Sequence, residues 1–134
     1  MFRVTKEIHF CYGHRLLRYQ GKCRYLHGHN ARVEIELSSS QLDKRGMVFD
    51  FNEIKSTLQR WIDETLDHKM LLHRADPVLA SLKRLREPVV TIEKNPTAEV
   101  LAQMIFNHAK EQGFPVSEVR LWETPTSFAT YRPT

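Results

Sequence analysis

The side chains best suited to chemistry lie close together in the first quarter of the sequence. Cys23 precedes a His-Gly-His sequence that places His27 and His29 two residues apart, and a third histidine, His14, lies upstream. Three imidazoles bind zinc and leave its fourth position open for water or substrate. The pattern predicts a catalytic zinc site on His14, His27 and His29. The alternative is that each histidine caps a strand or makes a buried hydrogen bond.

The two cysteines differ in their surroundings. Cys23 lies four residues before His27 and between two cations, Lys22 and Arg24, so it could be a fourth metal ligand or a thiolate base. Alternatively, Cys23 is a small buried apolar residue without a chemical role, a description that fits Cys11 better. No role is assigned to Cys11. A disulfide between them is not expected in a reducing compartment.

Two acidic positions are further candidates. Asp67 and His68 place a carboxylate beside an imidazole, which suits proton transfer, although a helix end with a favourable charge would look the same. Glu123 shares its strand phase with Val119 and Leu121, so its carboxylate points at an apolar face and needs donors. A planar ligand with two adjacent N–H groups would satisfy it, as would a structural arginine or backbone amides.

Alternating hydrophobicity predicts the strands that carry these residues. One strand is expected over Phe2 to Tyr12, with Gly13 ending the pattern before His14. A second is clearest over Ala31 to Leu37, and His27 and His29 share its apolar phase. The intervening loop is basic and could bind phosphate. Its cations, with one just beyond, are Arg15, Arg18, Lys22, Arg24 and Arg32.

Two helices are expected in the middle of the chain. Asp50 is a good N-cap for a helix whose apolar residues recur to Leu66, after a short extended segment over 47–49. Asn95 and Pro96 look like the start of the second, which Gly113 and Pro115 end. Between them, 69–94 is irregular, with a short helix over 77–85 and an extended piece over 89–92. Two closing strands, 116–124 and 128–132, surround a hairpin loop.

The order ββααββ predicts one α+β domain over 1–134, an antiparallel four-stranded sheet with two long helices on one face. The chain of 134 residues has a net charge of +4 and no run of apolar residues long enough to cross a membrane. Its first residues show no secretory signal, so a cytoplasmic location is expected. The charge suits an anionic ligand such as a phosphate ester. No nucleic-acid-binding signature accompanies it.

The sequence resembles the family of 6-pyruvoyltetrahydropterin synthases and 6-carboxytetrahydropterin synthases from about Phe2 to Arg132. The resemblance rests on motifs that follow one another in the family's order. They are Phe10 with His14-Arg15-Leu16, Cys23 with His27-Gly28-His29-Asn30, Leu66-Asp67-His68, Pro96-Thr97-Ala98-Glu99, and Trp122-Glu123-Thr124. Residues 46–51 also look like the family's entry to its first long helix. Cys11, Tyr12 and Gly13 depart from the small residues common before the first histidine.

The resemblance implies the tunnelling fold (T-fold), in which strands of three subunits form a barrel and two trimers stack into a homohexamer. Active sites then lie between subunits, so that Asp67 and His68 serve the Cys23 and zinc of a neighbour. The implied substrate is 7,8-dihydroneopterin triphosphate. The implied residues are the zinc ligands His14, His27 and His29, the catalytic Cys23, Asp67 and His68, and the substrate-binding Glu123 and Thr97.

Three residues separate Cys23 from His27, a spacing similar to that of the carboxy-forming group. The resemblance therefore implies formation of 6-carboxy-5,6,7,8-tetrahydropterin with release of acetaldehyde and triphosphate, a step of 7-deazaguanine and queuosine biosynthesis. The alternative is the pyruvoyl product without side-chain cleavage. A third group of the family, which directs the same substrate toward folate, carries Glu in place of the cysteine. The presence of Cys23 argues against this group. Two rival functions are an unrelated zinc hydrolase or hydro-lyase that uses the same histidines, and a non-catalytic module that binds a pterin or nucleotide.

Overall fold

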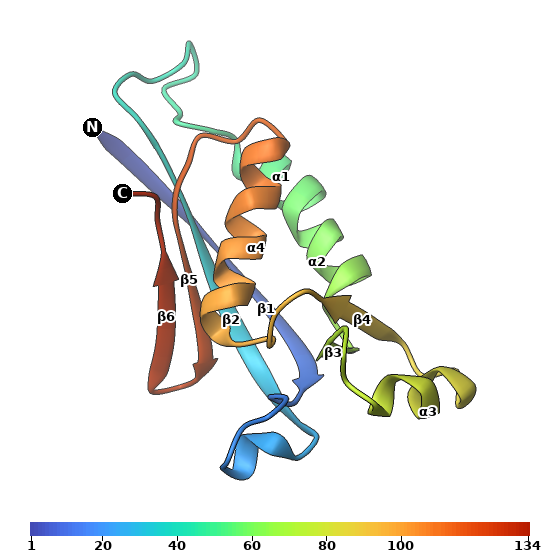
Figure 1. Cartoon of the computed structure of the whole chain (residues 1–134). Helices are drawn as coiled ribbons and strands as arrows, with labels where there is room; N and C mark the ends of the chain where they lie inside the picture. Colours follow the sequence, from blue (N-terminus) through green and yellow to red (C-terminus); the bar gives the residue numbers. More distant parts are fainter.

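The computed structural model describes residues 1–134 as one curled, six-stranded sheet with helices packed on it (Figure 1). The strands lie in the order β4-β3-β1-β2-β5-β6. Their bounds are β1 (Phe2–His14), β2 (His27–Ser39), β3 (Lys69–His73), β4 (Val89–Ile92), β5 (Val116–Thr124) and β6 (Ser127–Tyr131). The β1–β2, β2–β5 and β5–β6 pairs are antiparallel, whereas β3 pairs in parallel with both β1 and β4.

Strands β1 and β2 form the long central ribbon that carries the predicted histidines. Their residues alternate between a buried and an accessible face over most of their length, as the sequence predicts. The antiparallel register places His14 opposite His27 and Tyr12 opposite His29. Strand β1 continues through Gly13 to His14, two residues beyond its predicted end. The three histidines therefore lie at one end of the ribbon.

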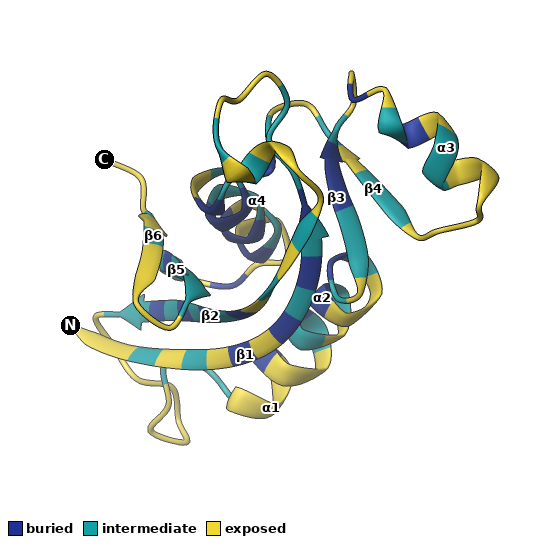
Figure 2. Cartoon of the chain, turned by 90° about the horizontal axis from the view of Figure 1, so that it is seen from below, coloured by how far each residue is buried: buried dark blue, intermediate teal, exposed yellow.

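The helices cover one face of the sheet. α1 (Phe51–Ile54), a wider π-helical turn over 55–59 and α2 (Arg60–Thr65) form one continuous helix, and Asp50 caps it by accepting a hydrogen bond from Asn52 N. α4 (Ala98–Glu111) lies beside it, where the rings of Trp61 and His108 stack 4.0 Å apart. The short α3 (Val78–Arg84) stands apart from them near β3 and β4 (Figure 2).

The core lies between the central strands and these two long helices. Figure 2 shows the buried residues gathered on those elements, while β6 and α3 are mostly accessible. Apolar residues of α1, α2 and α4 pack on the alternate residues of β1, β2 and β5. Burial of these side chains supplies the main driving force for folding. None of the helices has the length and apolar character needed to cross a membrane.

The predicted fold is correct in class but wrong in detail. The structure has a mixed sheet of six strands and three helices rather than four antiparallel strands and two helices. The two additional strands are β3, which the sequence pattern does not predict, and β4, predicted only as an extended piece; both come from the irregular stretch over 69–94. The helix predicted over 77–85 is confirmed as α3. Residues 47–49 form no strand. Thr97 rather than Asn95 caps α4, because Thr97 Oγ1 accepts the hydrogen bond from Val100 N.

Candidate active site

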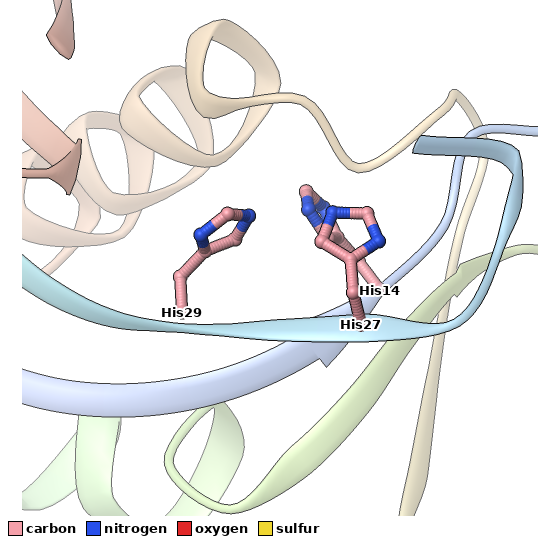
Figure 3. A group of neighbouring side chains, drawn as sticks. All are labelled: His14, His27 and His29. Carbon is pink, nitrogen blue, oxygen red and sulfur yellow. The ribbon is translucent and has the colours of Figure 1, made fainter. Parts of the chain in front are cut away.

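The three predicted histidines converge on one point. His14 ends β1, and His27 and His29 open β2, with their side chains on the helix-covered face (Figure 3). One ring nitrogen from each lies within 4.8 Å of the others. His14 is buried, and His27 and His29 are half-buried. This convergence follows from the register of the β1–β2 ribbon, because His14 pairs directly with His27.

Backbone carbonyls fix the orientation of two of these imidazoles. His14 Nδ1 lies 2.7 Å from the Pro96 carbonyl oxygen, and His27 Nδ1 lies 2.7 Å from that of Tyr25. A carbonyl only accepts hydrogen bonds, so each Nδ1 carries the proton and each Nε2 keeps a free lone pair. Metal-bound histidines are typically held in this way. Pro96 and Tyr25 therefore act on the cluster through their main chains.

The loops around the cluster are anchored to each other. Asn95 accepts a hydrogen bond from Leu17 N at 2.8 Å and donates one to the Leu17 carbonyl at 3.0 Å. This holds the Pro96 carbonyl next to the end of β1. Thr97, predicted to bind substrate, caps α4 in the structure. The sequence marks Asn95 by its place before a proline. It does not predict the hydrogen bonds with Leu17, which is 78 residues away in the chain.

The histidine cluster fits a metal ion. His14 Nε2 and His29 Nε2 are buried and have no hydrogen-bond partner. Glu123 Oε1 lies 3.3 Å and 3.1 Å from these nitrogens, but neither contact has hydrogen-bond geometry. Burial lowers the pKa of His29, which favours the neutral ligating form. Three convergent imidazoles could hold a metal ion with an open coordination position.

Glu123 reaches this cluster from β5, as its strand phase predicts. Its carboxylate contacts His14 and His29 but lies outside the set of atoms that converge within 4.8 Å. The neighbouring imidazoles, His14 first, lower the pKa of Glu123 against the opposing effect of burial. A cavity of about 410 Å³ opens beside it, between the start of α4 and the β5–β6 hairpin. The carboxylate is thus ionised and placed beside a space for a ligand.

A second cluster joins Cys11 to the predicted pair Asp67 and His68. Asp67 accepts hydrogen bonds from Cys11 N at 2.9 Å and from His68 Nδ1 at 2.8 Å. His68 N donates to the Cys11 carbonyl at 2.7 Å, and Cys11 Sγ lies 3.5 Å from His68 Nε2. Asp67 therefore fixes the tautomer of His68 and leaves Nε2 as the basic nitrogen. Cys11, to which the sequence assigns no role, is part of this cluster.

The two clusters lie on opposite faces of the sheet. Cys11 alternates with the buried Phe10 and Tyr12 along β1, so its side chain projects away from the histidine cluster. A cavity of about 670 Å³ is lined by Cys11, His68 and the apolar Met70, Leu82 and Leu85, and also by His27 and His29 at the start of β2. Within one chain the side chain of Cys11 and the histidine cluster therefore project from opposite faces of β1 and β2.

Cys23 belongs to neither cluster. It lies in a 3-10 turn over Lys22–Arg24, half-buried, and its carbonyl accepts a hydrogen bond from Leu16 N at 2.8 Å. In the same loop Arg15 is committed to a structural contact. Its Nε donates to the buried Asp76 at 2.7 Å, and its Nη2 donates to the other oxygen. Arg15 is therefore a poor candidate for phosphate binding.

Comparison with known proteins identifies the family. The family model for 6-pyruvoyl tetrahydropterin synthase matches residues 3–134. The chain belongs to this family. A 6-carboxy-5,6,7,8-tetrahydropterin synthase of Rickettsia felis is 37% identical over 96% of this chain and 98% of its own. The synthase of the same name from Haemophilus influenzae is 34% identical over 98% and 99%.

Two solved structures share this fold. An uncharacterised protein of Wolinella succinogenes superposes with a TM-score of 0.82 at 27% identity, covering 99% of this chain and 98% of its own. The 6-pyruvoyl tetrahydropterin synthase of Caenorhabditis elegans gives a TM-score of 0.75 at 24% identity, over 99% and 96%. The second likeness supports the fold alone.

Proposed function

We propose that the protein converts 7,8-dihydroneopterin triphosphate to 6-carboxy-5,6,7,8-tetrahydropterin, with zinc on His14, His27 and His29, and releases acetaldehyde and triphosphate. The relatives' name describes the synthesis of this pterin. The family resemblance assigns the reaction to queuosine biosynthesis. The observation that carries the proposal is the convergence of three imidazoles beside Glu123. One part of the substrate would contact the imidazoles, and another part would contact Glu123.

Glu123 binds the pterin ring in this proposal. The amide edge of a pterin offers two adjacent N–H donors, and a carboxylate accepts both as a fork. The cavity of about 410 Å³ next to Glu123 has room for the ring. Ala98 and Glu99 form part of the wall of that cavity, and Thr97 directly precedes them in the chain. Binding there places the substrate's side chain toward the histidine cluster.

Proton transfer is the task of Cys23, Asp67 and His68. A zinc ion on the histidines would act as a Lewis acid toward the oxygens of the substrate's side chain. Cys23 as a thiolate removes a proton from that side chain. His68, held by Asp67, accepts or supplies the second proton at Nε2.

The triphosphate binds the basic loop between β1 and β2. Arg18 and Lys22 have no ion-pair partner in the chain, whereas Asp76 holds Arg15, and Arg32 pairs with Glu7 and stacks on Trp122. Arg24 contacts only its neighbours Gly21 and Tyr25. Arg18, Lys22 and Arg24 are therefore the cations available for phosphate.

The active site is shared between subunits of a homohexamer. Within one chain Asp67 and His68 face away from the histidine cluster, and Cys23 belongs to neither group. An assembly that brings the Asp67–His68 pair of one chain to the Cys23 and zinc of the next would complete the site. Closed symmetric oligomers repeat such a contact at every interface.

Incubation of the zinc-loaded protein with 7,8-dihydroneopterin triphosphate tests this function. The expected products are 6-carboxytetrahydropterin, acetaldehyde and triphosphate, identified by mass spectrometry and an aldehyde assay. A pyruvoyl product without acetaldehyde would replace the carboxy-forming reaction with the pyruvoyl-forming one. If the protein consumes no substrate, the remaining function is that of a non-catalytic module that binds a pterin or nucleotide. His27→Ala serves as the matched control, because it removes one imidazole of the cluster.

A further inference from the structure

The buried hydroxyl of Tyr12 has no hydrogen-bond partner. The side chain is 3% exposed, and Phe10, its neighbour on the same face of β1, fills the same kind of position without a hydroxyl. A phenylalanine would avoid the cost of burying an unpaired donor. Such a group calls for an explanation, and a missing ligand is one.

Tyr12 forms part of the wall of the histidine cluster. Its ring meets that of His14 edge-on at 5.1 Å between centroids, and lies 5.8 Å from that of His29, its partner across the ribbon. Four buried side-chain atoms of the chain lack partners: Tyr12 Oη, His14 Nε2, His29 Nε2 and Arg120 Nε. Three of the four belong to residues at this one point, which indicates a site built for a ligand.

The unpaired groups also indicate what kind of ligand fits. Imidazole nitrogens with free lone pairs accept a cation, but a neutral phenol at physiological pH offers a hydrogen-bond donor. A metal ion alone would leave the phenol proton unpaired. An oxygen atom bound at or next to the metal position would satisfy it. A hydroxylated side chain supplies such oxygens, and an unsubstituted ring does not.

We propose that Tyr12 donates a hydrogen bond from its hydroxyl to an oxygen of the substrate's hydroxylated side chain at the histidine cluster. The inference rests on the proposed function for the identity of that side chain. Tyr12 keeps its proton throughout and forms no covalent bond. Its contribution is a fixed donor in a dry site, aimed at an oxygen that gains negative charge when the adjacent carbon loses a proton.

Tyr12→Phe tests this with the ring kept and only the hydroxyl removed. Binding is measured by the fluorescence of two unreactive ligands, neopterin, which carries a trihydroxypropyl side chain, and pterin, the same ring without it. The variant should bind neopterin about tenfold more weakly and pterin equally well. Turnover should fall by about a hundredfold, the usual effect of losing one such donor.

Two controls separate this role from a structural one. Tyr131→Phe makes the same substitution on the edge strand β6, where the ring packs edge-on against Phe106, and should change neither affinity. Tyr12→Phe should retain wild-type zinc content and thermal stability, because the hydroxyl has no partner in the unliganded protein. A variant that melts at a lower temperature or loses zinc would contradict the proposal.

The outcome also distinguishes this inference from the proposed function. If the wild-type protein prefers neopterin to pterin and the variant shows the same preference and turnover, the role of Tyr12 is wrong and the function stands. If the wild-type protein prefers neither ligand and consumes no dihydroneopterin triphosphate, the function is wrong and this inference fails with it.

Discussion

The two thiols of the chain occupy different chemical surroundings. Cys11 contacts the ring of His68 on the accessible face of β1, and Cys23 lies in the basic turn and contacts neither cluster. The sequence singles out Cys23 because it precedes the histidines. It has no signal for Cys11, whose partner lies 57 residues away in the chain. Contact with His68 does not make Cys11 the base, since the substrate side chain is expected on the other face.

Replacement of Cys23 tests the division between metal binding and proton transfer. Cys23→Ala should retain one zinc per chain, because the cluster is formed by histidines alone. Turnover should fall by about a hundredfold or more, the usual effect of losing a general base. Metal analysis and product formation measure the two quantities separately. Retention of most activity would instead support a hydrolase-like reaction with zinc-bound water as the base.

The histidines themselves show how far residue-level prediction reaches. Their convergence follows from strand phase, which the sequence contains, and the structure confirms that all three share the covered face. What holds them in place does not follow from the sequence. Pro96 contributes a backbone carbonyl from 82 residues away, and any residue type has a carbonyl there. The unpaired hydroxyl of Tyr12 likewise becomes visible only when burial and partners are known.

Among the elements, the end of β1 is fastened to the start of α3 by one ion pair. Both oxygens of Asp76 bond to the guanidinium of Arg15, and Asp76 is 3% exposed. This contact lowers the pKa of Asp76 below its ordinary value, with Arg15 as the main cause. The carboxylate thus stabilises the fold only while it is ionised.

Asp76→Asn should therefore destabilise the protein by about 3 kcal/mol at neutral pH, as expected when a buried ion pair loses one partner. The contribution of Asp76 is complete above the pKa of an unfolded aspartate, about 3.9, and is lost as the pH falls through the lower folded value. Denaturant unfolding of both proteins between pH 7 and pH 2 measures this. The stability gap should narrow with acid. A stability difference that stays constant or widens would show that the Arg15–Asp76 pair is not the source of the stabilisation.

The elements differ in how clearly the sequence predicts them. β1 and β2 alternate cleanly, and both long helices have caps and helical spacing, so the sequence predicts all four. β3 escapes prediction because Leu71 and Leu72 are both buried, which removes the alternation. Its parallel pairing with β1 also depends on contacts between distant segments. The continuous helix from Phe51 to Thr65 agrees with its prediction, but its π-helical turn has no sequence signal.

At the scale of the whole molecule, the placement of the two clusters on opposite faces bears on assembly. Within one chain the sheet separates the Asp67–His68 pair from the histidine cluster. The cavity of about 670 Å³ lies next to His68, with apolar walls from Met70, Leu82 and Leu85. A neighbouring subunit that covers this cavity would bury apolar surface and complete the site in one step.

Mixing two inactive variants tests whether the active site is shared. His27→Ala removes a proposed metal ligand and His68→Ala removes the proposed acid-base imidazole, so each homo-oligomer should be inactive. If each site takes its metal ligands from one chain and His68 from another, random mixing after subunit exchange restores about a quarter of the sites. Activity near that level supports the shared site. Mixtures as inactive as either parent, with exchange verified by mass spectrometry, would show that each chain uses its own residues, and a monomer in light scattering would exclude the hexamer.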